Sequence, residues 1–217
     1  DDVLILCNFD HASVLAVEII KRFKKLGLSV HKPSKDSSKS KIGKLADGFD
    51  YLGYTFIDQS ISVRLGSIEK LKASLAAIFT RYKYSGRDNT KFLIWRLNLR
   101  ITGCVFENKR KGWLFFFSEI NDEELLHVLD HYVKNLAKRF GVDIKPKKFV
   151  RAFKEMTHRR HETNYIPNFD DYDLAKQKDV LVEYFKWTYI RLGQLSDEEI
   201  TFQFHKCIGK QVKELEV

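Results

Sequence analysis

Apolar residues recur at helical spacing over most of the chain, and this periodicity predicts a largely helical protein. In the first predicted helix, apolar side chains fall on one face and charged side chains on the other. Asp10, Ser67 and Asn121 are expected to cap the starts of helices. Gly27 and Gly141 are expected to end two of them. The predicted helices cover residues 10–26, 68–84, 89–102, 121–140, 145–160, 174–192 and 197–214.

Short runs of β-branched and aromatic residues predict a few strands. Gly53, inside an aromatic run, is expected at a bulge or at a close approach of two backbones. The apolar run at residues 113–117 is either a strand or another buried segment. The pattern predicts an α+β fold, in which short antiparallel strands with a packed helix precede a mostly helical region. The predicted strands are residues 3–6 and 28–31, with a hairpin of residues 49–56 and 60–65.

The composition is that of a globular, basic protein. The 217 residues are 44% hydrophobic and 13% aromatic, and the formal net charge is +9. This charge favours a polyanionic partner such as nucleic acid. No apolar run reaches the ~20 residues of a transmembrane helix, so we expect no membrane partner. Cys7, Cys104 and Cys207 have neither a disulfide nor a zinc spacing, which favours reduced thiols in a cytosolic protein.

Positive charge is concentrated in two segments. Residues 81–111 contain nine Lys or Arg against two acids, and residues 145–160 contain seven against one. Arg96 and Arg100 lie one helical turn apart and can point at the same groove. Such segments can neutralise the phosphates of a nucleic acid, and a solvated basic face is the alternative interpretation.

The charge balance reverses from residue 161 onward, where seven Lys or Arg stand against eleven Asp or Glu. Residues 165–172 are expected to form a linker or turn before two helices, the second of which begins at Ser196 with Glu199 three residues later. An acidic pair of helices is a poor surface for a nucleic-acid duplex. We therefore expect these helices to pack internally or to contact a protein partner.

Two adjacent carboxylates, Asp1 and Asp2, directly precede the apolar run of residues 3–6. Carboxylates beside a buried strand are costly unless something neutralises their charge. Mg²⁺ is suited to this because it prefers hard oxygen ligands and is commonly held by one or two carboxylates together with substrate phosphates. The alternative is a frayed and solvated chain end.

Three motifs occur in an order that resembles the second half of the palm of a reverse transcriptase. The acidic doublet in DDVLILC is followed by a helix, then by the lysine-bearing LGLSVHKPSKD, and then by FDYLGYTF. Members of this family carry a Tyr-x-Asp-Asp turn, a helix, a lysine-bearing strand and loop, and a primer-grip hairpin. The chain is similar to the bacterial branch, which includes group II intron, retron and phage-defence enzymes. The resemblance covers residues 1–65 and continues more weakly, into a thumb, toward residue 140.

The resemblance implies roles for individual residues of the first part. Asp1 is implied to be the more direct Mg²⁺ ligand and Asp2 a weaker one, with two ions shared with a third carboxylate upstream of this chain. Lys35 is implied to protonate the departing pyrophosphate, with Lys32 and Lys39 as alternatives. The implied primer grip consists of Phe49, Tyr51, Leu52 and Gly53.

The same resemblance implies a palm segment at residues 1–65, a thumb-like helical domain at 66–142 and a helical C-terminal extension at 143–217. The implied activity is RNA-directed DNA synthesis in the bacterial cytoplasm, with an RNA template, a DNA primer and dNTP substrates. We expect the fragment to be inactive without the missing upstream half. The alternatives are a noncatalytic, maturase-like RNA-binding module and a phage-defence assembly module. The residues expected to contact nucleic acid are Arg87, Lys91, Arg96, Arg100, Lys147, Lys148 and Arg151.

Overall fold

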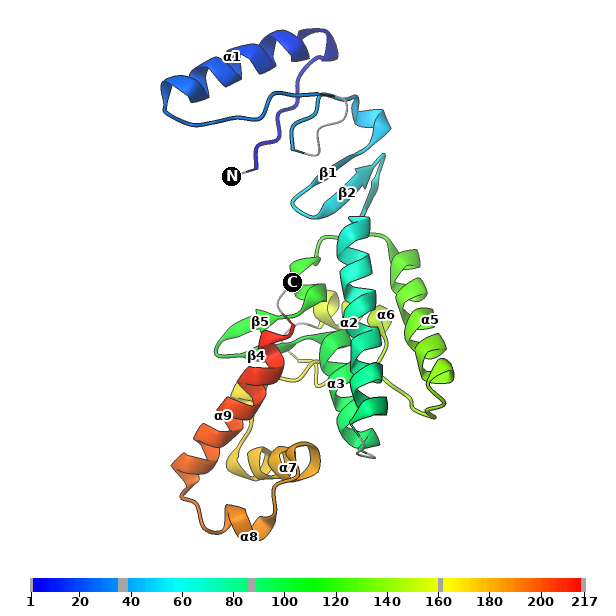
Figure 1. The fold of residues 1–217 in the computed structure, drawn as a ribbon, viewed down its shortest axis with the longest axis vertical. Coiled ribbons are helices and arrows are strands. Elements are labelled where there is room, and N and C mark those ends of the chain that lie inside the picture. Colours follow the sequence, from blue (N-terminus) through cyan, green and yellow to red (C-terminus); the bar gives the residue numbers. More distant parts are fainter. Residues whose placement is uncertain (1, 35–38, 86–88, 160–161, 216–217) are drawn as a thin grey trace. The chain divides into compact units, whose positions relative to one another are not determined.

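The computed structural model describes residues 2–34, 39–85, 89–159 and 162–215, and it confirms a mixed α+β fold (Figure 1). The chain forms two compact units, Asp1–Arg64 and Leu65–Val217. Both the predicted thumb and the predicted extension belong to the second unit. None of the helices in the described ranges combines the length and the apolar character needed to cross a lipid bilayer.

The first unit contains one long helix and a three-stranded antiparallel sheet in the order β1-β2-β3. Among its described residues, Val63 is the only one that is buried. The apolar residues of this unit therefore form very little core. Its elements are η1 (Phe9–His11), α1 (Ala12–Lys25), η2 (Leu45–Asp47), β1 (Phe49–Tyr51), β2 (Tyr54–Ile57) and β3 (Ser60–Val63).

Residues 3–6 and 28–31 do not form the predicted strands. Their composition favours extended backbone, but a strand also needs a neighbour that pairs its N–H and C=O groups. In the described residues of this unit, the sheet contains only β1, β2 and β3. The side chains of Val3 and Leu6 are exposed, so the first apolar run is not buried either.

The predicted strand over residues 49–56 is divided by a tight turn. Leu52 and Gly53 have φ angles of 50° and 87°, and Tyr51 pairs with Tyr54 across the turn. A two-residue loop with two positive φ angles matches the right-handed twist of paired strands. Gly53 therefore lies in a turn and not inside a strand, and the predicted hairpin becomes a three-stranded meander.

The start of α1 also differs from the prediction, whereas its end agrees with it. Asn8 accepts a hydrogen bond from the Asp10 amide at 3.4 Å and caps η1. The helix α1 follows without a side-chain cap at His11. Asp10 is therefore not the cap, because the chain first makes a 3₁₀ turn. Gly27 has a φ of 74° just beyond the helix, the conformation that glycine adopts most readily.

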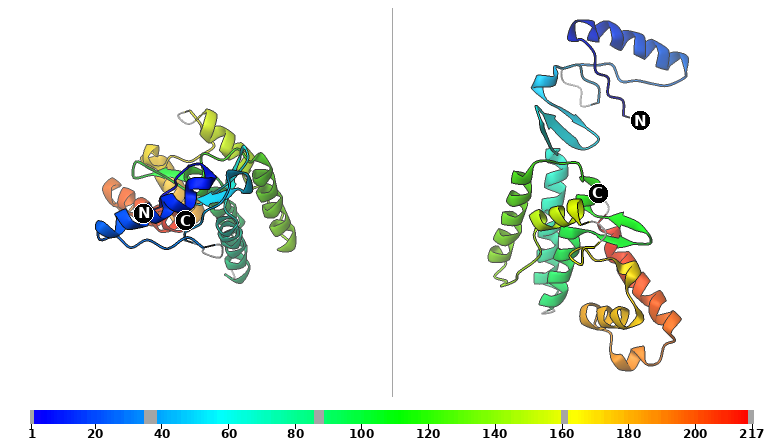
Figure 2. Two further views of the ribbon diagram at one scale, coloured as in Figure 1. Left: turned by 90° about the horizontal axis from the view of Figure 1, so that it is seen from above. Right: turned by 180° about the vertical axis from the view of Figure 1, so that it is seen from behind.

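The second unit is mainly helical, and the α2–α3, α2–α5 and α7–α9 pairs pack side by side (Figures 1 and 2). A two-stranded antiparallel sheet, β4-β5, follows α3. The elements are α2 (Leu65–Tyr84), α3 (Thr90–Thr102), β4 (Cys104–Phe106), β5 (Lys109–Lys111), α4 (Trp113–Phe116), α5 (Glu123–Arg139), α6 (Phe149–His158), η3 (Phe169–Asp171), α7 (Leu174–Phe185), α8 (Tyr189–Leu192) and α9 (Asp197–Lys213).

Most predicted helices of this unit are confirmed, with corrections at their ends. Ser67 lies inside α2 and does not cap it. Asp122, not Asn121, caps α5 by accepting a hydrogen bond from the Leu125 amide at 2.9 Å. Lys186 has a φ of 61°, which divides the predicted helix of residues 174–192 into α7 and α8. The apolar run at 113–117 contains the short helix α4, in which Trp113 and Leu114 are buried and Phe116 is exposed.

The capping box of α9 is confirmed. The Ser196 hydroxyl accepts a hydrogen bond from the Glu199 amide at 3.2 Å, and the Glu199 carboxylate accepts one from the Ser196 amide at 2.8 Å. Two N–H groups that lack helical partners are satisfied in this way. The local sequence was sufficient for this prediction because all the groups involved lie within four residues.

The helix α9 is held by an aromatic core that it shares with β4, η3 and α7. Phe204 lies at the centre, with its ring edge-on to Phe169 and stacked against Tyr172. Phe106 of β4 and Leu181 of α7 belong to the same core. One face of α9 thus packs against residues that are far apart in sequence. The helices of the acidic C-terminal segment therefore pack internally.

We expect Phe204→Ala to destabilise the second unit by about 3 kcal/mol, because it removes a fully buried ring and leaves a cavity. Phe202 on the same helix is 64% exposed, so Phe202→Ala is expected to change the free energy of unfolding by less than about 0.5 kcal/mol. Urea unfolding monitored by tryptophan fluorescence measures both, since Trp95, Trp113 and Trp187 all lie in this unit. Equal losses in the two variants would contradict the packing described for α9.

Candidate functional site

The second aspartate of the acidic doublet lies beside the aromatic hairpin. The Tyr51 hydroxyl donates a hydrogen bond to the Asp2 carbonyl oxygen at 3.3 Å, across a separation of 49 residues. Asp2 is exposed, so its carboxylate is accessible to solvent. Asp1 lies outside the described residues. The structure therefore brings together one residue of the predicted metal site and one of the predicted primer grip.

The predicted primer grip coincides with β1 and the turn that follows it. The ring of Phe49 stacks on that of Phe56 with a centroid distance of 5.0 Å, which fixes β1 against β2. Leu52 is exposed at the tip of the turn, and the φ of 87° at Gly53 allows the chain to reverse. The hairpin thus presents backbone and an apolar side chain at its tip.

The lysine loop can be described only in part. Lys35 lies outside the described residues, and Lys32 and Lys39 are both exposed. The Ser34 amide donates a hydrogen bond to the Ser40 carbonyl at 3.3 Å, which closes the base of the loop. The choice among the three lysines stays a prediction.

The described residues do not contain a complete metal site. No group of three or more His, Cys, Asp or Glu side chains in these ranges is arranged to hold a metal ion. Asp2 alone supplies one hard oxygen ligand of the kind that Mg²⁺ prefers. A magnesium site here would need Asp1 and a carboxylate from elsewhere, which is the ligand set that the resemblance to reverse transcriptases implies.

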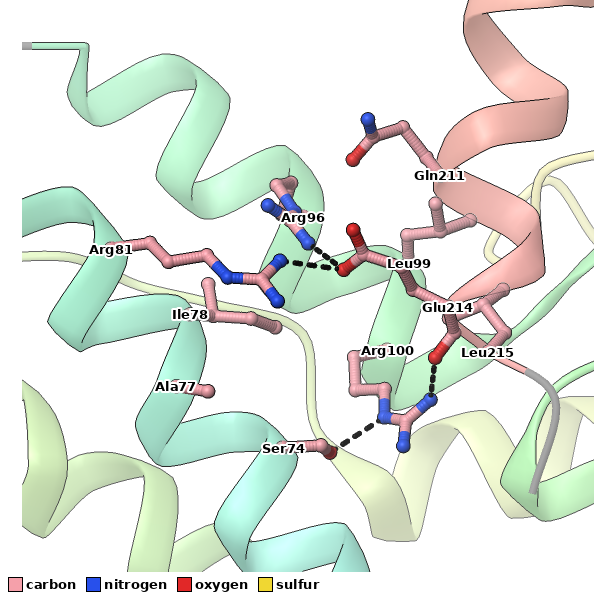
Figure 3. Close-up of a pocket in the computed structure, with 10 residues that line it drawn as sticks. All are labelled: Ser74, Ala77, Ile78, Arg81, Arg96, Leu99, Arg100, Gln211, Glu214 and Leu215. Atoms are coloured by element: carbon pink, nitrogen blue, oxygen red, sulfur yellow. Dashed lines mark hydrogen bonds and ion pairs between the residues drawn. The ribbon is translucent and has the colours of Figure 1, made fainter. Parts of the chain in front are cut away.

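Arg96 and Arg100 do point into one pocket, but an acidic residue already occupies it (Figure 3). Glu214, at the end of α9, accepts hydrogen bonds at one carboxylate oxygen from Arg96 and, at 2.8 Å, from Arg81 of α2. Its carbonyl oxygen accepts a hydrogen bond from Arg100 at 2.6 Å. Arg100 also donates to the Ser74 hydroxyl at 2.8 Å.

Burial dominates the electrostatics of these arginines. Burial lowers the pKa of Arg96, the Glu214 charge raises it, and the neighbouring Arg81 lowers it. The pKa of Arg100 is lowered for the same main reason, again opposed by Glu214. Because the ordinary pKa of an arginine lies far above neutral pH, both side chains keep their charge at neutral pH. The pocket therefore contains permanent, largely desolvated positive charge.

The second basic segment is organised around Tyr165. The Lys147 ammonium donates to the Tyr165 carbonyl oxygen and lies 4.9 Å from the centre of its ring. The Arg151 guanidinium lies 4.5 Å from the same ring centre, and the Lys148 amide donates to the Tyr165 hydroxyl at 2.8 Å. Burial, with a contribution from Arg151, lowers the pKa of Lys147. The Lys147 side chain is partly buried and is held by its contacts with Tyr165, whereas Lys148 and Arg151 are exposed.

Of the remaining residues predicted to contact nucleic acid, Lys91 lines one groove together with Lys147. Lys91 is exposed and forms an ion pair with Glu183 of α7 at 3.2 Å. Arg87 lies outside the described residues. A groove of about 800 Å³ runs between α3, α7 and the 162–172 segment, and its lining contains four basic and four acidic side chains. Among the described residues predicted to contact nucleic acid, Lys91, the Arg96 and Arg100 pair, and the Lys147 and Arg151 pair thus have different partners.

Neither Glu214 nor Tyr165 was predicted to contact a basic side chain. Glu214 lies 118 residues from Arg96, and Tyr165 lies 18 residues from Lys147. Neither residue has a local pattern that predicts an arginine or lysine partner. These contacts depend on how α2, α3, α6 and α9 pack, which no short segment encodes.

Comparison of the chain with protein-family models, curated proteins and solved structures found no match.

Proposed function

We propose that this chain is the C-terminal portion of an RNA-directed DNA polymerase of the reverse transcriptase type. In this proposal, residues 1–65 complete a palm, residues 66–142 form a thumb, and residues 143–217 form a helical extension. The order of acidic doublet, helix, lysine loop and FDYLG hairpin supports it. The α+β character of the structure is compatible with it.

One contact carries most of the proposal. The hydrogen bond from Tyr51 to the Asp2 carbonyl joins the doublet to the hairpin, although 49 residues separate them. A polymerase needs these two features together, because the metal-binding carboxylates must lie beside the primer terminus held by the hairpin. A frayed doublet with no fixed neighbour would be expected to lack such a contact.

Each motif has a distinct task in the proposed reaction. Asp1 and Asp2 hold positive charge near the primer end, and the hairpin fixes the primer 3′-hydroxyl in line with the incoming dNTP. Two bound Mg²⁺ ions would activate that hydroxyl and stabilise the charge on the triphosphate. A lysine of the loop donates a proton to the pyrophosphate as it leaves. The residues contribute mainly by positioning, as is general for nucleotidyl and phosphoryl transfer.

The burial pattern of the first unit supports its assignment as part of a larger domain. Val63 is the only buried residue among the described residues of this unit, and Val3, Leu6 and Val14 are exposed. A unit of this length would normally bury a cluster of apolar side chains. Further polypeptide packed on these residues would supply the missing core.

The noncatalytic RNA-binding alternative rests on the second unit. This unit contains its own aromatic core and presents Lys148 and Arg151 to solvent. Those features need neither a metal ion nor the acidic doublet. A phage-defence assembly role would use the same unit for protein contacts.

The test uses the polypeptide together with any residues that precede Asp1 in its gene. We expect extension of a DNA primer on an RNA template with dNTPs and Mg²⁺, and no extension when EDTA removes the metal. RNA binding with a clear salt dependence but no extension would favour the noncatalytic alternative. Absence of both activities would contradict the polymerase proposal and the noncatalytic RNA-binding alternative.

A further inference from the structure

Three arginines and one glutamate meet where α2, α3 and α9 come together. The pocket between them has a volume of about 290 Å³, several times the ~30 Å³ that a water molecule occupies in the liquid. Arg81, Arg96, Arg100 and Glu214 are the charged residues of its lining, which gives the pocket a formal charge of +2 (Figure 3). An excess of positive charge in this half-open pocket favours an anionic ligand.

The contacts among the described residues use only part of the donor capacity of these arginines. A guanidinium has five N–H donors. One carboxylate oxygen of Glu214 accepts hydrogen bonds from both Arg81 and Arg96, and the Glu214 carbonyl oxygen accepts one from Arg100. A phosphate group offers three or four oxygens in place of one shared oxygen, and guanidinium groups bind it in paired, parallel hydrogen bonds.

Burial of Arg96 and Arg100 favours binding of an anion in addition to the Glu214 carboxylate. The Arg96 side chain is only 14% exposed and Arg100 is buried, so water compensates little of their mutual repulsion. Gln211 of α9 lines the same pocket, and its buried Oε1 atom has no hydrogen-bond partner among the described residues. A bound water, a protonated phosphate oxygen or a half-turn of the amide would satisfy this group.

Glu214 is well placed to leave the pocket without unfolding α9. It stands at the C-cap of the helix, and its side chain is 45% exposed. Val212 and Leu215 on either side are buried and hold the helix end in place. A rotation of one side chain therefore exchanges the carboxylate for another anion.

We infer that the arginine pocket is a phosphate-binding site and that the Glu214 carboxylate occupies it when no ligand is bound. The phosphate can belong to a nucleic acid or to a small molecule, because the same donors recognise both. The inference does not depend on polymerase activity, since no carboxylate of the first unit takes part in it. Glu214 then acts as an intramolecular competitor that sets the affinity of the site.

Titration of the full chain with inorganic phosphate at constant ionic strength, followed by calorimetry, tests the inference. We expect weak binding by the unmodified chain, because phosphate must displace Glu214. Glu214→Gln keeps the shape of the side chain and removes its charge, so the variant is expected to bind phosphate about tenfold more tightly. Glu183→Gln is the matched control, because Glu183 pairs with Lys91 away from the pocket, and its phosphate affinity should equal that of the unmodified chain.

Arginine variants supply the opposite arm of the test. Arg81 is 59% exposed, so Arg81→Ala should fold normally and bind phosphate several-fold more weakly. Arg96→Ala should bind more weakly still, and its unfolding midpoint shows whether the fold is intact. The inference is wrong if phosphate binds neither the unmodified chain nor Glu214→Gln, or if Arg81→Ala leaves the affinity of Glu214→Gln unchanged.

Competition with short oligonucleotides identifies the source of the phosphate. Two oligonucleotides of one sequence, with and without a 5′-phosphate, are added to the Glu214→Gln complex with inorganic phosphate. If both oligonucleotides displace inorganic phosphate equally, the result supports the site and assigns it to backbone phosphates. If only the phosphorylated oligonucleotide displaces it, the result supports the site and assigns it to a terminal phosphate. Binding of inorganic phosphate with no competition supports a site for a small phosphate and separates it from the proposed thumb.

Discussion

Asp1→Ala in the polypeptide that extends a primer is expected to lower dNTP incorporation by at least about 100-fold. A bound metal contributes several kcal/mol of transition-state stabilisation, and each 1.36 kcal/mol corresponds to a factor of ten in rate. Asp1 is the more direct ligand in the proposed site. Asp2→Ala should therefore cause a smaller loss. Primer extension under single-turnover conditions measures both effects on the chemical step.

A neighbouring carboxylate serves as the control for this prediction. Asp10 is exposed in η1, and its own carboxylate has no role in the proposed reaction. Asp10→Ala should retain the incorporation rate of the unmodified chain, and RNA binding should be the same in all three variants. Full incorporation by Asp1→Ala would remove the basis for a metal-dependent polymerase.

Gly103→Ala is expected to destabilise the second unit by about 4 kcal/mol, from backbone strain and steric overlap together. Gly103 has a φ of 66°, which side chains of L-residues rarely tolerate. A Cβ atom there would lie 2.4 Å from the Lys111 carbonyl oxygen and 3.0 Å from the Phe115 ring. The carbonyl belongs to β5, so the backbone of the β4-β5 hairpin would have to move.

Gly141 is a matched control because its φ of 67° is almost the same and nothing lies within 4 Å of the position of its Cβ atom. Gly141→Ala should therefore cost only the backbone strain, about 1 kcal/mol. Urea unfolding followed by tryptophan fluorescence separates the two variants. A Gly103→Ala protein as stable as Gly141→Ala would show that the hairpin does not approach this glycine closely.

Features that are determined by residues close together in the sequence were predicted more accurately than features that depend on distant residues. The helices α1, α2, α3, α5 and α9 were predicted because their apolar faces repeat within a few residues. The capping box at Ser196 and the helix end at Gly27 are equally local. The division of residues 49–56 at Leu52 was missed, because no Asn or Asp precedes Gly53 to indicate a hairpin turn.

Two of the strand predictions were wrong for a different reason. The apolar residues 3–6 and 28–31 have suitable composition, but strand formation requires a partner that composition does not supply. The ion pairs of Glu214 could not be predicted either, because the sequence does not indicate which of the eleven acidic residues after residue 161 pairs with the arginines. Packing of α9 on β4 and α7 selects one of them.

The sequence by itself determined the helical periodicity, the local caps, the excess of basic residues and the order of the motifs that resemble a polymerase palm. Each of these depends on residues that are neighbours along the chain. Only the tertiary structure decided that Tyr51 contacts Asp2, that Lys147 and Arg151 both lie against the Tyr165 ring, and that Glu214 occupies the arginine pocket. These contacts form when distant segments pack together, because the core that orients each segment is shared by the others.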